Sequence, residues 1–327
     1  FFDEAGKQAR LHRTMERALA GQAVRIHSST DDGNLVLVSA WSATNPGDYF
    51  LFDVAAGQAD RVLGQREWID PSKSAPVEFI RFNARDGLLL DGMLTSPARA
   101  KGPMPMVIVP HGGPFGVFET WEYDEEAQVL AQAGYRVLKV NFRGSGDRGR
   151  DFEQAGAREW GGKMQDDITD ATQWAIKQGL ADPGRICLAG ASYGAYAAMM
   201  GLAREPDLYR CGIGYVGVYD LERMARDDTA QGKSSATWVK QWVGEGDALR
   251  AASPTSMADR IKAPVLLVAG GRDEVAPIAH SRAMQRELKR AGVPVETLYV
   301  SSEGHGFFAE ENRRKHYTAV LEFLSRH

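Results

Sequence analysis

This sequence contains few cysteines and no long apolar run. It contains two cysteines in 327 residues, which excludes a small scaffold held together by disulfides. No apolar run approaches the roughly 20 residues of a membrane-spanning helix. Acidic residues outnumber basic ones and the net charge is −4, so charge favours neither a nucleic acid nor an anionic membrane as a partner.

The chain begins with Phe1 and not with methionine, and its first residues carry no signal-peptide pattern. We expect a fragment or a processed chain whose native N-terminus is absent. The compartment therefore stays open between cytoplasm and periplasm. The oligomeric state stays open as well, and a homo-oligomer is one of the alternatives.

The two cysteines, Cys187 and Cys211, each stand at the start of an expected strand, where a small buried hydrophobe fits. We expect two buried thiols, and a disulfide between neighbouring strands is the alternative. Neither belongs to a C-x-x-C motif for metal or redox work. The sequence implies no metal and no organic cofactor.

What is present begins with a run of short apolar stretches between residues 22 and 64. Turn-forming residues at 31–34, 45–48 and 56–57 separate them, so the pattern predicts about four antiparallel strands. Residues 7–20 predict a helix that leads into them. Four strands make one small sheet, and their spacing is typical of one β-propeller blade. The expected strands are 24–26, 35–38, 49–52 and 61–63.

From about residue 75 the pattern changes to buried strands that alternate with helices. Residues 77–84 and 88–95 predict a hairpin, and the later alternation predicts an α/β domain with a mostly parallel sheet. An eight-stranded sheet that opens with a hairpin is the arrangement of the α/β-hydrolase fold. We therefore divide the chain into a β segment, 1–70, and a hydrolase domain, 71–327. The later expected strands are 106–109, 135–141, 186–189, 213–216, 265–268 and 295–300, and the expected helices are 121–133, 163–178, 194–204, 276–291 and 312–325.

Residues 190–194 read GASYG, a G-x-S-x-G pentapeptide between an expected strand and an expected helix. That context is typical of a nucleophile elbow, which raises a serine on a sharp turn at the end of a strand. Side chains at 190 and 194 would collide with the neighbouring strand and helix. The pattern therefore predicts Ser192 as a nucleophile.

A serine hydroxyl is a weak nucleophile and needs a base, which in turn needs an orienting acid. In this fold the acid and then the histidine follow the serine along the chain. Asp273 follows the strand 265–268, and His305 follows the strand 295–300 between two glycines. We predict Asp273 as the acid, with Glu274 and Asp259 as rivals, and His305 as the base.

Acyl transfer also needs donors for the developing oxyanion. Residues 110–114, PHGGP, follow the strand 106–109, where the fold places one donor. The other is the backbone N–H of Tyr193, directly after the nucleophile. We expect His111 to pack and hydrogen-bond within this loop, and we expect Asp166 and Asp167 to lie on a solvated helix face.

Taken together, these motifs resemble the prolyl oligopeptidase family of serine peptidases, nearest its acylaminoacyl-peptidase and dipeptidyl-peptidase-like branches. The resemblance covers about residues 75–327, and Ala195 departs from it where a second glycine is common after the elbow. The matching segments are 111–114, 141–145, 190–194, 253–254, 271–273 and 304–307.

The resemblance implies a Ser192, Asp273 and His305 triad with backbone oxyanion donors at Gly113 and Tyr193. It also implies that residues 1–70 are the end of a β-propeller, whose missing part was cut away or lies on another chain. The implied activity is hydrolysis of short peptides through an acyl-enzyme. Two alternatives stay open: a carboxylesterase acting on small acyl esters, and a hydrolase-like binding module without catalysis. Specificity stays open too, because the aromatic residues Trp160, Tyr219, Trp238 and Trp242 fit a pocket or packing equally.

Overall fold

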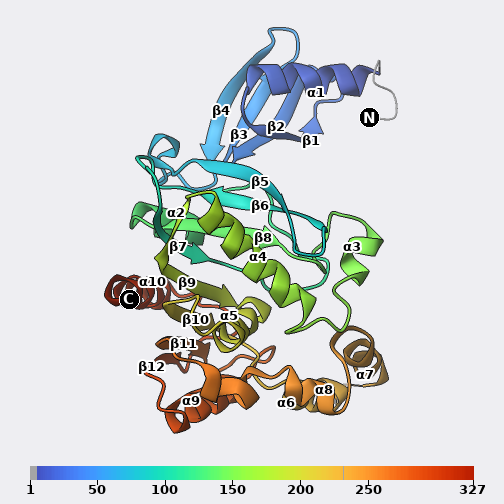
Figure 1. Ribbon diagram of the computed structural model, residues 1–327. Coiled ribbons are helices and arrows are strands. Elements are labelled where there is room, and N and C mark those ends of the chain that lie inside the picture. The colour runs from blue at the N-terminus through green and yellow to red at the C-terminus, as the bar shows by residue number, and fades with distance from the viewer. Residues whose placement is uncertain (1–5, 231) are drawn as a thin grey trace. The chain divides into compact units, whose positions relative to one another are not determined.

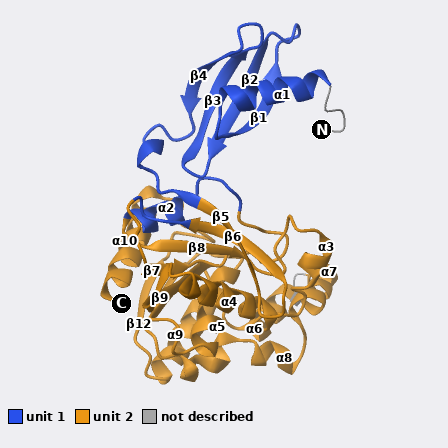
Figure 2. Ribbon diagram, turned by 45° about the horizontal axis from the view of Figure 1, so that its top comes forward, with its two compact units in different colours: residues 1–77, 95–98, 120–132 blue, residues 78–94, 99–119, 133–327 orange. Residues whose placement is uncertain are grey.

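The protein is described by a computed structural model that covers residues 6–230 and 232–327. The chain divides into two compact units, which Figure 2 shows in blue and orange. The first unit comprises 1–77, 95–98 and 120–132, and the second comprises 78–94, 99–119 and 133–327. Each has its own cluster of buried apolar side chains. The expected domain boundary at residue 70 stays a prediction.

The first unit is built on an antiparallel sheet in the order β1-β2-β3-β4, as the alternating pattern predicts (Figure 1). Met15 and Leu19, at the end of helix α1, pack in one cluster with Val36, Val38 and Phe52 of the sheet. Burial of these side chains stabilises the sheet, because an isolated sheet of four strands would expose both of its faces to solvent. The elements are α1 Lys7–Ala18, β1 Ala23–Ser29, β2 Leu35–Ser42, β3 Asn45–Asp53, β4 Gln58–Gly64, a 3₁₀ turn Pro71–Lys73 and α2 Glu125–Gln132.

The expected turn at residues 45–48 is wrong, because these residues begin β3. Asn45 pairs with Ser42 across the β2–β3 ladder, so the turn lies two residues earlier than the Asn-Pro-Gly-Asp signal suggests. The Ser42 hydroxyl accepts the N–H groups of Thr44 and Asn45 at 3.2 and 3.1 Å. This side chain closes the turn in place of the proline and glycine.

The sheet of eight strands has the order β12-β11-β10-β9-β7-β8-β6-β5 (Figure 1). Its strands from β7 onward pair in parallel, and β5 and β6 open it as a hairpin closed by a bond from Ala84 N to Leu88 O. The expected α/β-hydrolase fold is confirmed. The strands are β5 Val77–Asn83, β6 Leu89–Thr95, β7 Met104–Ile108, β8 Arg136–Asn141, β9 Ala181–Ala191, β10 Cys211–Tyr215, β11 Val265–Gly270 and β12 Val295–Val300.

Helices cover both faces of this sheet; α4 and α5 pack on β9, and α9 and α10 pack on β11 and β12 (Figure 1). The sequence pattern predicts these four long helices. It misses the short ones, such as α7, because they bury few or no side chains and so show no apolar period. The helices are α3 Arg150–Gln154, α4 Lys163–Lys177, α5 Tyr193–Arg204, α6 Leu221–Ala230, α7 Lys233–Trp238, α8 Asp247–Ala251, α9 Ala279–Arg290 and α10 Glu310–Arg326, with a π-helix Val239–Val243 and a 3₁₀ helix Pro254–Arg260. Within the described ranges, none has the length and apolarity that crossing a membrane requires.

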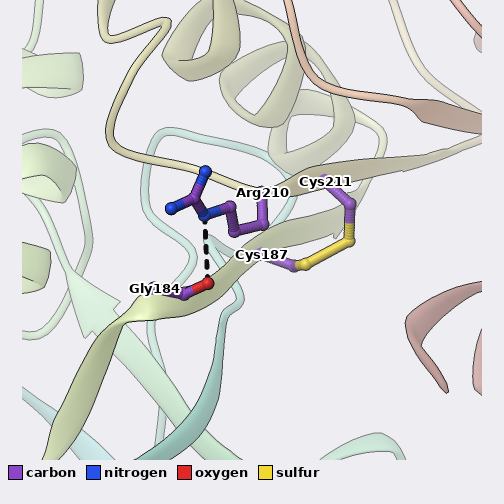
Figure 3. The surroundings of a disulfide bond; sticks show 4 residues. All are labelled: Gly184, Cys187, Arg210 and Cys211. Carbon is purple, nitrogen blue, oxygen red and sulfur yellow. Dashed lines mark hydrogen bonds between the residues drawn. A yellow bond between two sulfur atoms is a disulfide. The ribbon is translucent and has the colours of Figure 1, made fainter. Parts of the chain in front are cut away.

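The expectation of two free thiols is wrong, because a disulfide joins Cys187 of β9 to Cys211 of β10 (Figure 3). The two residues are direct partners in the parallel register, with Cα atoms 4.7 Å apart. That spacing lies within the range a disulfide spans. The sequence could not supply this register, since 24 residues and a whole helix separate the two cysteines.

The disulfide closes a loop of this length, so its removal should lower the free energy of unfolding by about 3 kcal/mol. We expect the Cys187→Ala/Cys211→Ala variant to unfold at lower urea concentration than the oxidised wild type. Adding dithiothreitol should shift the wild-type transition towards that of the variant and leave the variant unchanged. A wild-type transition that dithiothreitol does not move would contradict the bond.

Candidate active site

Ser192 lies on the tight turn between β9 and α5, half-buried and directly after the strand. Its backbone φ is 57°, a left-handed conformation that residues other than glycine rarely adopt. Such a conformation costs about 1–3 kcal/mol and persists only where its surroundings enforce it. One such contact is the bond from the Ser192 N–H to the Tyr215 carbonyl, at 2.9 Å.

Steric crowding explains why both positions that flank the turn, 190 and 194, are glycine. A Cβ on Gly190 would lie 2.5 Å from the carbonyl carbon of Gly194, and a Cβ on Gly194 would overlap the carbonyl oxygen of Pro110. Real Cβ atoms do not approach so closely, so only glycine fits either position. The departure at Ala195 is harmless, because its side chain is fully buried within the core.

The loop after β7 lies against Ser192. A Cβ on Gly112 would lie 3.4 Å from the Ser192 Cβ, so this backbone passes within contact of the serine. Gly113 has a φ of 114°, which favours glycine there. Tyr193 is the first residue of α5, so its N–H has no helical carbonyl one turn earlier to bond. Both amides predicted as oxyanion donors therefore belong to segments adjoining Ser192.

His111 holds this loop from within, as the sequence predicts. Its Nδ1 donates to the Gly112 carbonyl at 2.7 Å, and its Nε2 accepts from the Ser145 hydroxyl at 2.7 Å. Its ring stacks on Phe142 with centroids 4.3 Å apart. Burial lowers the pKa of His111 to about 4, so the ring is neutral at neutral pH and makes both bonds in one tautomer.

Asp273 and His305 are joined directly. The distance from His305 Nδ1 to Asp273 Oδ2 is 2.9 Å, and to Oδ1 it is 3.1 Å. The Asp273 side chain is fully buried, and its Oδ1 also accepts the N–H groups of Val275 and Ala276 at 2.9 and 2.8 Å. These bonds fix the carboxylate, which in turn fixes the orientation of the imidazole through its Nδ1.

The loop that carries His305 is anchored by Glu303. The Glu303 carboxylate accepts the N–H groups of Phe308 and Ala309 at 3.0 and 3.1 Å and the Asn312 amide at 2.7 Å. The Asn312 amide and these backbone donors lower the pKa of Glu303. The loop is thus built around a charged carboxylate at neutral pH.

Tyr215, at the end of β10, connects the serine to the histidine loop. Its carbonyl accepts the Ser192 N–H, and its hydroxyl accepts the N–H of Phe307, two residues after His305. The structure records no hydrogen bond between the Ser192 hydroxyl and His305, although it describes both residues. Such contacts often tighten only when substrate binds. Ser192 and the loop of His305 therefore share Tyr215 as a support, and β10 lies between the serine strand β9 and the acid strand β11.

Sequence reasoning missed Tyr215 and Glu303. Tyr215 ends the strand between the serine strand and the acid strand, and that position is the one sign that could have identified it. The expected solvated face at Asp166 and Asp167 is wrong for Asp167. This carboxylate is fully buried and pairs with Arg143 at 2.7 and 2.8 Å, because the helix α4 packs it inward.

Of the four aromatic residues considered for a side-chain pocket, two are buried in the core and two lie near the Gly113 loop. Trp160 and Tyr219 are buried in the core. Trp238 and Trp242 lie against Phe115, which follows the Gly113 loop, with ring centroids 6.2 and 4.6 Å away. Over residues 6–230 and 232–327, no cluster of three or more histidine, cysteine or acidic side chains is arranged to hold a metal ion.

Comparison with known proteins identifies a family that this chain matches. Residues 121–327 match the model of the prolyl oligopeptidase family. Dipeptidyl aminopeptidase BIII of Pseudoxanthomonas mexicana is 34% identical over 322 residues, which cover 91% of this chain and 45% of that protein. Dipeptidyl peptidase family member 6 of Caenorhabditis elegans is 27% identical, with coverage of 92% and 45%. The Pyrococcus horikoshii acylaminoacyl peptidase structure matches with a TM-score of 0.80 and 25% identity, over 92% of this chain and 49% of that one. The chain spans about half the length of these relatives.

Gly194→Ala tests the steric argument for the elbow. We expect it to lower the free energy of unfolding by about 3 kcal/mol or more, since the new methyl group overlaps backbone that cannot move aside. Urea unfolding measures this cost. Gly184→Ala is a control on the preceding strand, β9, where the added Cβ meets only the Asp182 carboxylate, at 3.3 Å. Equal stability of the two variants would refute the close approach.

His111→Gln tests the neutral buried imidazole. An unfolded histidine has a pKa near 6.5, so as the pH falls from about 6.5 towards 4 the unfolded chain takes up a proton that folded His111 does not. The wild type should lose about 2 kcal/mol of unfolding free energy to this group by pH 5. His111→Gln should not show this pH-dependent loss of unfolding free energy, whereas Ser145→Ala, which keeps the imidazole ring, should still show it. Identical pH slopes in the wild type and His111→Gln would show that the ring is not held neutral.

Proposed function

We propose that this chain, which belongs to the prolyl oligopeptidase family, is the catalytic part of a serine peptidase that hydrolyses short peptides. The observation that carries the proposal is the 2.9 Å contact between His305 Nδ1 and Asp273 Oδ2, which follow parallel strands at the same edge of the sheet as the elbow of Ser192. A histidine oriented by a buried carboxylate beside a strained serine matches the requirements of acyl transfer.

In the proposed reaction His305 Nε2 takes the proton of the Ser192 hydroxyl as Oγ attacks the peptide carbonyl carbon. The N–H groups of Gly113 and Tyr193 donate to the oxyanion that forms. Asp273 keeps the Nδ1–H of the imidazole in place and stabilises its positive charge. His305 then gives its proton to the leaving amine. In the second half of the reaction His305 takes a proton from water as the water oxygen attacks the acyl carbon, and it returns that proton to Ser192 Oγ as the acyl group leaves.

Short peptides are the proposed substrates because the named relatives are dipeptidyl and acylaminoacyl peptidases. We also propose that residues 1–70 are the last part of a β-propeller. The four antiparallel strands β1 to β4 support this assignment, and so does coverage of about half of each relative. The remaining blades would belong to the rest of the protein.

Ser192→Ala should abolish turnover of a blocked peptide amide while the urea-unfolding curve stays that of the wild type. Asp273→Asn should keep the fold and lower kcat by about 10⁴-fold, because the imidazole is left in the wrong tautomer. Steady-state kinetics of both variants measures these losses. Turnover that survives in Ser192→Ala would remove the serine from the mechanism.

Parallel assays separate the peptidase from an esterase of the same fold. We expect the chain to cleave both a blocked dipeptide amide and the matching short acyl ester, with both activities lost together in Ser192→Ala. Turnover of esters alone would replace the peptidase by a carboxylesterase. Absence of either activity in the folded chain would favour a binding module.

A further inference from the structure

A second feature of the hydrolase unit lies away from Ser192, on the earlier part of the same strand. A cleft of about 190 Å³ opens beside β9 where β7 and β8 begin and α10 ends. Its walls include Met106, Tyr135, Arg185 and Leu324, and Cys187 forms part of the lining. Cys187 is near the middle of β9, five residues before Ser192, so the cleft and the elbow lie at different points along the same strand.

The two sulfurs of the disulfide have different access to this cleft. Cys187 lines it and is 6% exposed, whereas Cys211 is 0% exposed and does not line it. Figure 3 shows the two residues on adjacent strands with the disulfide between them. A reagent that enters the cleft therefore meets Cys187 before Cys211.

We propose that Cys187 is a thiol-exchange site, at which a small external thiol opens the Cys187–Cys211 disulfide. The attacking thiolate bonds to Sγ of Cys187, the Sγ–Sγ bond breaks, and Cys211 leaves with the electron pair and takes a proton. The product is a mixed disulfide on Cys187 and a buried thiol on Cys211. No further oxidant or reductant is needed, because the external thiol supplies the sulfur that is oxidised.

The lining of the cleft suits this reagent. The Arg185 guanidinium stands at the site and attracts a thiolate, although Asp182 Oδ2, 2.8 Å from its Nε, offsets part of its charge. Tyr135, Met106 and Leu324 supply apolar surface for the carbon atoms of the thiol. Low-molecular-weight thiols fit the volume, and a folded protein bearing a thiol does not.

The exchange would act on the strand pair that supports the proposed active site. β9 ends directly before Ser192, and β10 ends at Tyr215, which bonds both the Ser192 N–H and the loop of His305. The disulfide is the one covalent link between these strands in the described ranges. Opening it removes that link while the ladder of hydrogen bonds remains.

Reduced glutathione tests the proposal on the native chain. The folded protein is incubated with glutathione without denaturant, free thiols are blocked at low pH, and peptides are mapped by mass spectrometry. We expect the glutathione adduct on Cys187 and the blocking group on Cys211. An adduct on Cys211, or exchange that occurs only in urea, would overturn the proposal. Two free thiols before glutathione is added would overturn it too.

Two single variants give an independent measurement. Cys211→Ser leaves Cys187 as a free thiol in the cleft, and Cys187→Ser leaves Cys211 as a free thiol in the core. We expect N-ethylmaleimide to modify Cys187 faster by a factor on the order of 100, because Cys211 must wait for local opening of the sheet. Equal rates in the two folded variants would refute selective access. Neither experiment depends on catalysis, so the result stands whether or not the chain is a peptidase.

Discussion

The contact on which the rest of the site depends is the close approach of three backbone segments at the serine turn. The end of β9, the start of α5 and the loop after β7 come so near one another that positions 190 and 194 have no room for a Cβ. This approach holds Ser192 at a left-handed φ and brings the backbone of Gly112 and Gly113 beside it. Ser192 and both predicted oxyanion donors are therefore placed by one packing arrangement.

The remaining groups reach the site because the sheet is parallel. Strands β9, β10, β11 and β12 are neighbours, so residues that follow them gather at one edge although more than 100 positions separate Ser192 from His305. β10 supplies no catalytic side chain, yet Tyr215 at its end bonds segments on either side of it. The disulfide at its start ties it to β9 as well. The central strand pair is thus the support for the whole proposed triad.

The sequence predicts what depends on short-range pattern. The alternation of strands and helices identifies the fold, and the G-x-S-x-G turn and strand-end residues identify Ser192, Asp273 and His305 as candidates. Register is different, because it is decided by long-range pairing. The Cys187–Cys211 bond depends on this register. The role of Tyr215 and the buried pair of Asp167 with Arg143 depend on packing between segments that are far apart in the sequence. The short helix α7 between β10 and β11 was missed for another reason, since it buries no side chain and so leaves no apolar period.

The central claim is that Ser192 is activated by the histidine that Asp273 orients. Labelling with a fluorophosphonate tests this most directly, since the reagent bonds covalently to a serine whose proton a neighbouring base removes. The account predicts one label per chain, mapped to Ser192 by peptide mass spectrometry, and loss of labelling in a folded His305→Gln variant. A label on another residue, or equal labelling of Ser192 without His305, would contradict it.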